Sequence, residues 1–328
     1  MSKEIVLSGM RPTGRLHLGN YFGALKNWVK LQDEYMCYYE IADWHALMSD
    51  YDDPDTIYKQ CQDMICVWLA VGLDPSKCVM FRQSEVHEHL QLYFILSTVT
   101  PLGWLERCPT YKEALQNIEE KDIRNYAFLG YPVLQAADIV LYNANKVPVG
   151  KDQLPHLELT RELVRRFSHI YSAEVMVEPD ALMTKVQKLS GTDGRKMSKS
   201  YGNTIFITEE KETLEKKVSS MITDPERIHP TDIGHPEVCT VFEYHKIFSQ
   251  EETAQIEKDC KAGKTGCVQC KKTLMGNLEK LISLYRDKYL HYKQNPEEVN
   301  NILEEGNAKA REFAAANLKK FREAMKFG

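Results

Sequence analysis

The first half of the chain alternates short apolar runs with longer amphipathic stretches. The apolar runs have the length and composition of strands, at 5–8, 37–43 and 78–83. The stretches that follow them repeat apolar residues with a helical period, at 19–33, 55–71 and 85–99. Strands joined through helices at this spacing predict an α/β fold with a doubly wound parallel sheet, whose ligands bind beyond the carboxyl ends of the strands.

The second part of the chain has a different pattern. From about residue 209 the strand signals stop and long helical periods follow, as in 209–221 and 271–289. We therefore expect a domain with the sheet over 1–205 and a helical domain over 206–328. The sequence shows no internal repeat and no low-complexity linker, so we expect the two parts to pack together.

Composition limits the class of protein. With 328 residues, 43% hydrophobic and 27% charged, the chain has an ordinary globular composition. The N-terminal apolar segment is too short for a signal peptide or a membrane span, so we expect a soluble, cytoplasmic protein with no membrane partner. The nine cysteines are then expected as thiols or metal ligands. A net charge of −5 predicts no DNA partner and leaves RNA contacts to local basic patches.

A glycine-rich segment, Ser8 to Asn20, follows the first predicted strand and opens the first helix. Gly9 and Gly14 allow a tight backbone turn, and the helix start near His17 directs free N–H groups and a partial positive charge at an anion. His17 and Asn20 lie three apart on one helical turn, so both can donate hydrogen bonds to that anion. This predicts a phosphate site; the alternative is a glycine-rich turn with a capping histidine.

A second segment, Gly191 to Asn203, carries three cations in five positions, Arg195, Lys196 and Lys199. Its flanking glycines and serines indicate a loop that can close over a polyphosphate and neutralise the charge of a leaving group. Taken alone, such a loop is more commonly just exposed.

Together the two segments resemble the signatures of class I aminoacyl-tRNA synthetases. His17-Leu18-Gly19-Asn20 is similar to their His-Ile-Gly-His motif, and residues 196–200 match their Lys-Met-Ser-Lys-Ser motif. The resemblance implies a Rossmann-type catalytic domain followed by a helical anticodon-binding domain, with ATP and Mg²⁺ as cofactors.

The resemblance also implies roles for residues. His17 and Asn20 would bind the ATP phosphates, while Lys196 and Lys199 would stabilise the transition state at the α-phosphate and the departing pyrophosphate. Lys112 matches a further pyrophosphate-contacting lysine of the tryptophanyl group. The other implied ATP contacts are Ser8, Gly9, Arg11, Thr13, Gly19, Gly150, Asp152, Met197, Ser198 and Ser200.

An amino-acid pocket is expected between two segments in the middle of the chain. Tyr131, Gln135 and Asp138 fall at i, i+4 and i+7 and form a polar stripe on an apolar helix. The alternative is a helix whose polar side faces water. Segment 147–153 resembles the form found in tryptophanyl-tRNA synthetases. The resemblance implies a tryptophan pocket formed by Leu7, His45, Tyr131, Gln135, Asp138, Val147, Val149 and Gln153.

Within this pocket, the resemblance implies that Asp138 accepts the indole N–H while Tyr131 and Gln153 hold the amino and carboxylate groups. Because an unpaired buried carboxylate is costly, we expect an analogue lacking the N–H to leave Asp138 unpaired and to be rejected. His45 either completes the site or is a core histidine.

Some positions depart from the simplest tryptophanyl pattern: Leu7 stands where Phe is common, Arg11 where Gln is common, and Gln135 where Met is common. Tyrosyl enzymes use glutamine at the last position. A tyrosyl-tRNA synthetase is therefore one rival, although it would carry a Gly-Gly-Ser-Asp-Gln-like segment instead of 147–153. A non-catalytic iron–sulfur module that binds RNA or acts in redox chemistry is the other.

Four cysteines, Cys239, Cys260, Cys267 and Cys270, have the spacing Cys-x20-Cys-x6-Cys-x2-Cys. Four thiolates with one tight pair can hold Zn²⁺ or a [4Fe–4S] cluster, and a metal-free site is a third alternative. Zinc sites usually have two tight pairs, which favours iron–sulfur. A subset of tryptophanyl synthetases with a [4Fe–4S] cluster near the anticodon looks similar. The other cysteines are expected in the core, namely Cys37, Cys61, Cys66, Cys78 and Cys108.

Lysines surround the four cysteines, which predicts contacts with RNA phosphates. The expected tRNA contacts are Lys264, Lys271 and Lys272. The resemblance implies tryptophan, ATP and tRNA(Trp) as partners. It also implies a homodimer whose interface lies, with the tryptophan pocket, in 105–165. The basic residues of the C-terminal segment are more simply a solvated helix face.

Overall fold

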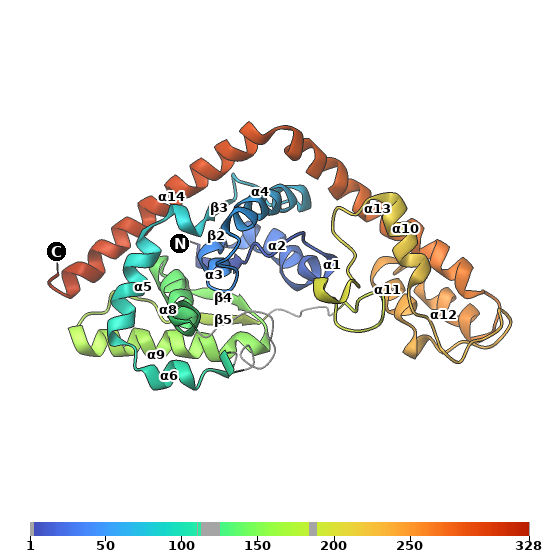
Figure 1. Cartoon of the computed structure of the whole chain (residues 1–328), viewed down its shortest axis with the longest axis horizontal. Helices are drawn as coiled ribbons and strands as arrows, with labels where there is room; N and C mark the ends of the chain where they lie inside the picture. Colours follow the sequence, from blue (N-terminus) through green and yellow to red (C-terminus); the bar gives the residue numbers. More distant parts are fainter. Residues whose placement is uncertain (1–2, 110, 113–124, 184–188, 328) are drawn as a thin grey trace.

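The computed structural model describes residues 3–109, 111–112, 125–183 and 189–327, as drawn in Figure 1. Five strands form one parallel sheet in the order β3-β2-β1-β4-β5. The strands are β1 (Ile5–Met10), β2 (Met36–Ile41), β3 (Cys78–Arg82), β4 (Lys146–Val149) and β5 (Asp180–Met183). The predicted α/β class and the first three strands are confirmed. From β1, the chain adds β2 and β3 on one side of the sheet and β4 and β5 on the other. At such a change of direction a crevice is expected, here at the carboxyl ends of β1 and β4.

Helices cover both faces of the sheet, because side chains of a strand alternate between its two sides. Val6, Tyr39 and Ile41 pack in one core against Trp28 and Trp68. These tryptophans come from α2 (Lys26–Glu34) and α4 (Pro54–Val71). The other core contains strand residues such as Leu7 and Tyr38. It is covered by α5 (Glu88–Val99), α8 (Tyr126–Leu141) and α9 (Leu154–Tyr171).

The first predicted helix, 19–33, is not continuous. It consists of α1 (Leu18–Asn20), the π-helical turn η1 (Tyr21–Leu25) and α2. Within η1, the hydroxyl of Tyr21 lies 2.7 Å from that of Tyr285, and Phe22 packs edge-on against Phe248. The wider π-helical turn of η1 therefore coincides with contacts to the helical part of the chain. Hydrophobic periodicity alone does not predict such a turn.

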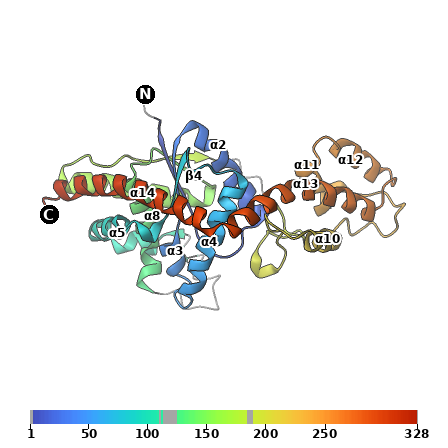
Figure 2. The ribbon, with the colours of Figure 1, turned by 90° about the horizontal axis from the view of Figure 1, so that it is seen from above.

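The second part is helical, as predicted: its described residues add no strand to the sheet. It comprises α10 (Lys211–Ser220), α11 (Thr240–Phe248), α12 (Thr253–Lys261), α13 (Cys267–Gln294) and α14 (Pro296–Ala324). Figures 1 and 2 show α13 and α14 as two long arms that join the small helices to the sheet. The domain boundary near residue 205 remains a prediction.

The C-terminal helix α14 packs within the sheet domain, against β3 and α5. Gly306 lies so close to β3 that a Cβ there would be 1.8 Å from the Met80 carbonyl oxygen. Ala310, Ala314 and Phe321 are fully buried. A segment predicted as part of the helical domain therefore contributes to the core under the sheet.

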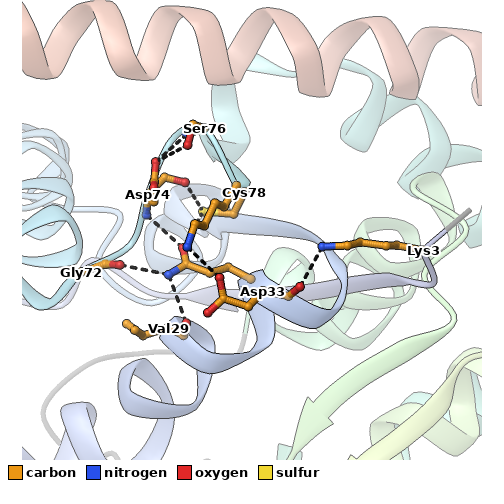
Figure 3. Close-up of polar contacts among 9 residues, drawn as sticks. Lys3, Val29, Asp33, Gly72, Asp74, Ser76 and Cys78 are labelled. Atoms are coloured by element: carbon orange, nitrogen blue, oxygen red, sulfur yellow. Dashed lines mark hydrogen bonds and ion pairs between the residues drawn. The ribbon is translucent and has the colours of Figure 1, made fainter.

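Polar contacts fix the amino ends of the strands, as Figure 3 shows. The Gln32 side chain donates to the carbonyl oxygens of Val29 and Gly72, both at 3.0 Å, and accepts from the Asp74 N–H at 2.9 Å. The Lys3 ammonium donates to the Asp33 carbonyl oxygen at 2.8 Å. The bonds of Gln32 tie α2 to the turn after α4, at the end of the sheet opposite the carboxyl ends of the strands.

The remaining short elements connect these parts. They are α3 (Asp43–Leu47), α6 (Leu102–Glu106), η2 (Gln83–Glu85), η3 (Lys151–Gln153), η4 (Lys199–Tyr201) and η5 (Pro236–Val238). Among the described helices, none is long and apolar enough to cross a membrane.

Candidate active site

A cavity of about 480 Å³ opens at the carboxyl ends of β1 and β4. All of the residues predicted to bind tryptophan line it, namely Leu7, His45, Tyr131, Gln135, Asp138, Val147, Val149 and Gln153. Three predicted ATP contacts, Ser8, Gly9 and Arg11, also line it. Sequence reasoning missed several wall residues, among them Glu40, Ser49, Phe128 and His156.

Asp138 lies at the floor of this cavity and is 1% exposed. Its Oδ2 lies 2.9 Å from His45 Nε2, and its Oδ1 lies 2.6 Å from His89 Nδ1. The Gln83 amide also donates to Oδ1, at 2.9 Å. The expectation that Asp138 is left unpaired without an indole N–H is therefore wrong: α5 and the segment after β3 bring His89 and Gln83 to it, which the sequence did not indicate.

The hydrogen bonds from these neighbours determine the ionisation of Asp138. Burial by itself raises a carboxyl pKa, but the hydrogen bonds from His45 and His89 outweigh burial and hold the pKa of Asp138 below its usual range. His45 is thus a partly exposed residue of the cavity wall whose ring is hydrogen-bonded to Asp138.

Glu40 is the unexpected neighbour of Asp138. It is 4% exposed, and its Oε2 has no hydrogen-bond partner among the described residues. Burial, followed by the nearby Asp138 carboxylate, raises the pKa of Glu40 well above its usual value. The sequence did hold a signal, because Glu40 is the only charged residue in the buried strand 37–41.

A chain of hydrogen bonds orients the other end of the cavity. The Tyr131 hydroxyl lies 2.9 Å from His156 Nε2, and His156 Nδ1 lies 3.0 Å from Gln153 Oε1. His156 therefore couples the predicted residues Tyr131 and Gln153. Gln135 lines the same wall.

Arg11 reaches across the mouth of the cavity. It donates to Ser49 Oγ and lies 3.6 Å from the Asp50 carboxylate. Burial lowers the pKa of Arg11, although the nearby Asp50 opposes this effect. A guanidinium remains charged under all ordinary conditions, so Arg11 places a fixed cation beside the cavity.

The two signature segments meet. The Lys199 ammonium donates to the Thr13 carbonyl oxygen at 2.6 Å, and the Leu18 N–H donates to the Ile205 carbonyl oxygen at 2.9 Å. Burial, followed by the charge of Lys199, lowers the pKa of His17 to about 4. His17 is therefore neutral near pH 7 and can donate or accept a hydrogen bond.

Asn20 also has a local role in this region. Its side-chain oxygen accepts the His17 N–H at 3.0 Å, which closes the first turn of α1. Gly19 is required for close packing, because a Cβ there would lie 2.9 Å from the His17 ring. The signature around 17–20 is thus a compact helix start.

Asn203, which the sequence analysis did not single out, organises the lysine loop. Its side chain accepts the Ser198 N–H at 2.8 Å and donates to Asp193 Oδ1 at 2.7 Å. It also donates to the Lys196 carbonyl oxygen at 3.1 Å, while the Lys196 side chain is exposed. Within the loop, Met197 is buried, and the Ser198 and Ser200 hydroxyls are 2.9 Å apart.

The structure describes three other predicted ATP contacts, Lys112, Gly150 and Asp152, in less detail. Lys112 is exposed, at the edge of the described residues, and Gly150 precedes η3. The side chain of Asp152 lies outside the described residues. Lys112 and Gly150 are not among the described residues that line the cavity around Asp138.

The four clustered cysteines surround a second cavity, of about 440 Å³, formed largely by α11, α12 and α13. Burial, followed by the other three thiols, raises the pKa of Cys270 to about 12. His245 Nε2 lies 3.3 Å from Cys270 Sγ, and Arg227 donates to Cys260 Sγ at 3.8 Å. The other five cysteines are buried, which confirms their expected place in the core.

Known proteins agree with this geometry. The family described as tRNA synthetases class I (W and Y) matches residues 2–283. The tryptophan–tRNA ligase of Thermotoga maritima is 46% identical, over 98% of both chains. That of Aquifex aeolicus is 40% identical, over 98% of this chain and 99% of its own.

A crystal structure gives the same result. Tryptophanyl-tRNA synthetase from Campylobacter jejuni, complexed with ADP and tryptophan, superimposes with a TM-score of 0.90 at 34% identity. The match covers 98% of this chain and 100% of that one. The chain therefore belongs to the class I tRNA synthetases of the tryptophan and tyrosine group, and within that group to the tryptophan–tRNA ligases.

Proposed function

We propose that this chain activates tryptophan with ATP at the cavity around Asp138 and then transfers it to tRNA(Trp). The observation that carries the proposal is that Lys199 reaches Thr13 at 2.6 Å while Ser8 and Gly9, from the same segment as Thr13, border the cavity that holds Asp138. Amino acid and triphosphate would thus be held on adjacent sites. These substrates also favour a cytoplasmic location.

Tryptophan would occupy the cavity with its indole ring on the apolar walls Leu7, Val147 and Val149. Asp138 Oδ2 receives one hydrogen bond from His45 and has capacity for a second, which the indole N–H would supply. Tyr131 and Gln153 would hold the α-amino and carboxylate groups. Because the donors around Asp138 are already in place, little reorganisation is needed when the substrate binds.

ATP would bind where the two signature segments meet. The start of α1 offers free N–H groups to phosphate, while Lys196, Lys199 and Arg11 supply positive charge. Mg²⁺, when bound with ATP, shares the phosphate charge. The other predicted ATP contacts, including Lys112 and Asp152, remain part of this proposal.

The chemistry needs no general base. The tryptophan carboxylate is ionised near neutral pH, so one of its oxygens attacks the α-phosphorus and pyrophosphate leaves. A hydroxyl at the 3′ end of tRNA then attacks the acyl carbon, and AMP leaves. The chain contributes positioning and charge stabilisation, with the lysines acting on the negative charge of the departing pyrophosphate.

Tryptophan-dependent ATP–pyrophosphate exchange tests the proposed role of Asp138. Asp138→Asn should raise the KM for tryptophan about 10- to 100-fold, because a hydrogen bond to a charged acceptor is lost. Asp180→Asn on β5, an exposed position, is the matched control and should leave the KM unchanged. An unchanged KM in a folded Asp138→Asn protein would remove Asp138 from tryptophan recognition.

We further propose that the four clustered cysteines hold a [4Fe–4S] cluster. In a tetrahedral zinc site with bonds of about 2.3 Å, the sulfurs lie roughly 3.8 Å apart. Among the described residues, no three cysteine sulfurs lie within 4.8 Å of one another. A cubane cluster separates its cysteines more widely, because each is bonded to a different iron.

Metal analysis of anaerobically purified protein tests this assignment. We expect iron and inorganic sulfide at about four of each per chain, together with broad visible absorption. Stoichiometric zinc without iron would contradict the cluster. Cys267→Ser should reduce bound iron, whereas Cys66→Ser, at a buried cysteine of the sheet domain, should retain it.

The lysines around this site are proposed to contact the anticodon side of tRNA. Lys271 already donates to the Ser219 carbonyl oxygen at 2.7 Å, which links α13 to α10. Lys272→Ala and Lys264→Ala should therefore test RNA binding more cleanly than Lys271→Ala. They should raise the KM for tRNA severalfold without changing the exchange reaction, and Lys280→Ala, further along α13, is the control.

We also propose a homodimer. Exposed apolar side chains gather on α5, α6 and the start of α8, where Phe94 is 69%, Leu102 63% and Tyr126 74% exposed. Such surfaces commonly mark protein interfaces. Phe94→Glu should shift the sedimentation coefficient from dimer to monomer, while Ile228→Glu, in the helical part, should leave it unchanged.

A further inference from the structure

Glu40 occupies a place in the sheet that only a glycine neighbour allows. In the register of the parallel strands, Glu40 lies between Gly9 of β1 and Phe81 of β3. A Cβ at Gly9 would lie 2.6 Å from Glu40 Oε1 and 2.7 Å from its Cγ. The Glu40 side chain therefore lies across the backbone of β1 and brings a carboxyl group to the cavity that Asp138 also lines.

The two carboxyl groups share a buried space. Suitable ligand atoms of Glu40, His89 and Asp138 all lie within 4.8 Å of one another, and all three residues are buried. Glu40 Oε2 has no hydrogen-bond donor among the described residues. Two ionised carboxylates at this separation repel each other strongly away from water, so a proton on one of them is the simplest way to satisfy both.

The surrounding donors indicate which carboxyl group holds that proton. Asp138 already accepts hydrogen bonds from His45, His89 and Gln83, which stabilise its ionised form. The charged groups that act on Glu40, Asp138 and then Asp43, are carboxylates that disfavour a second negative charge. The Tyr142 hydroxyl lies 3.0 Å from His89 Nε2. Burial, followed by the nearby Glu40 and Asp138, also raises the pKa of Tyr142.

A metal ion fits this cluster less well than a proton does. Two zinc ligands at about 2.1 Å from the metal would be roughly 3.4 Å apart in a tetrahedral site. His89 Nδ1 and Asp138 Oδ1 are separated by 2.6 Å, which is a hydrogen-bond distance. The histidine and the carboxylate are thus bonded directly to each other.

We propose that Glu40 is held in its protonated form and donates its O–H to Asp138 while the cavity is empty, as a positioning residue that fills the acceptor position taken by the indole N–H on binding and so keeps this carboxylate in place for tryptophan. The inference rests on the proposed role of Asp138 in binding the indole N–H. It adds that the cavity floor carries a single negative charge instead of two, which favours entry of an apolar ring.

Infrared difference spectroscopy tests the protonation state. At pH 7.5 the wild-type protein should show the C=O stretching band of a protonated carboxyl group, and the band should shift in D₂O. Glu40→Gln should lack this band. Glu215→Gln, an exposed position on α10, is the matched control and should keep it. A band that is absent from the wild type, or unchanged in Glu40→Gln, would overturn the proposal.

The exchange reaction tests the positioning role. Glu40→Gln retains a neutral N–H donor, so the KM for tryptophan should stay within about threefold of the wild type. Glu40→Met has a similar length but no donor, and should raise that KM about tenfold while the KM for ATP is unchanged. Rescue by glutamine but not by methionine is a result that a merely structural role would not give.

The outcomes separate this inference from the proposed role of Asp138. If Asp138→Asn raises the KM for tryptophan and Glu40→Met leaves it at the wild-type value, the role of Glu40 is wrong and that of Asp138 stands. If neither variant changes the KM, the proposed tryptophan site itself fails. Thermal unfolding of each variant checks that the fold is retained, and the infrared test does not depend on Glu40→Met.

Discussion

The cavity around Asp138 and the lysine loop at 191–203 are proposed to serve one reaction but are built in different ways. In the cavity, polar groups are buried and fixed by side chains from α5, α8 and the segment after β3. In the loop, the backbone is held by Asn203 while Lys196 projects into solvent. The difference indicates that the polar groups proposed to recognise the amino acid are in place before it binds. The positive charge comes instead from exposed side chains, which a bound triphosphate would draw together.

The largest expected effect comes from the loop. Lys199→Ala should lower kcat for exchange about 10²- to 10³-fold, because it removes the cation that we propose acts on the leaving phosphates. The KM for tryptophan should stay near the wild-type value, since the cavity is intact. Steady-state exchange kinetics measure both constants. Lys211→Ala, at the exposed start of α10, is the control, and a rise in the tryptophan KM alone would contradict the division of roles.

Gly9→Ala should have the opposite effect: the KM for tryptophan should change more than kcat. A methyl group at this position would force the Glu40 side chain to move, since their separation would be 2.6 Å. We expect the KM for tryptophan to rise about tenfold, with a smaller change in kcat. Gly23→Ala provides the comparison, because a Cβ there meets no described atom within 4 Å. Equal behaviour of the two variants would show that the space beside Gly9 is not limiting.

A weaker effect is expected when the support of the loop is removed. Asn203→Ala deletes the hydrogen bonds to Ser198, Asp193 and Lys196, so the loop loses its preferred shape. We expect kcat to fall about three- to tenfold, while equilibrium binding of tryptophan is unaffected. Asn301→Ala on α14, an exposed site, should change neither. Loss of tryptophan binding in Asn203→Ala would mean that loop and cavity are structurally coupled.

The smallest expected effect concerns pH. The pKa of His17 falls from 6.5 to about 4 on folding, so between these values the unfolded chain binds a proton that the folded chain does not. Stability from this residue is therefore present above pH 6.5 and is lost as the pH falls towards 4.

Comparison with a variant that lacks the histidine isolates the contribution of His17 to the free energy of unfolding. The loss at pH 5 should be about 1 kcal/mol or less, once solvent screening is allowed for. Denaturant unfolding of the wild type and His17→Asn at pH 7 and pH 5 gives the difference. A wild-type protein that loses no more stability than the variant on acidification would show that His17 titrates normally in the fold.

Much of the site was predictable because its chemistry is local in the sequence. The polar stripe of Tyr131, Gln135 and Asp138 follows from helical periodicity, and all three line the cavity. The signatures around His17 and Lys199 were expected to act on the same triphosphate, and the Lys199–Thr13 hydrogen bond shows that the two segments meet. The π-helical turn after Asn20 was not predicted, because it accompanies contacts with the distant residues Phe248 and Tyr285.

The sequence by itself determined the α/β class with its first three strands, the two signature segments and many residues of the cavity wall, since each depends on spacing within one element or on a short motif. Only the tertiary structure decided which donors surround Asp138 and that Glu40 lies beside it. His89, Gln83 and Glu40 come from three different segments, and their contacts depend on strand register and on the missing Cβ of Gly9. Protonation and charge in the cavity follow from these long-range contacts, because burial and neighbouring donors set a carboxyl pKa.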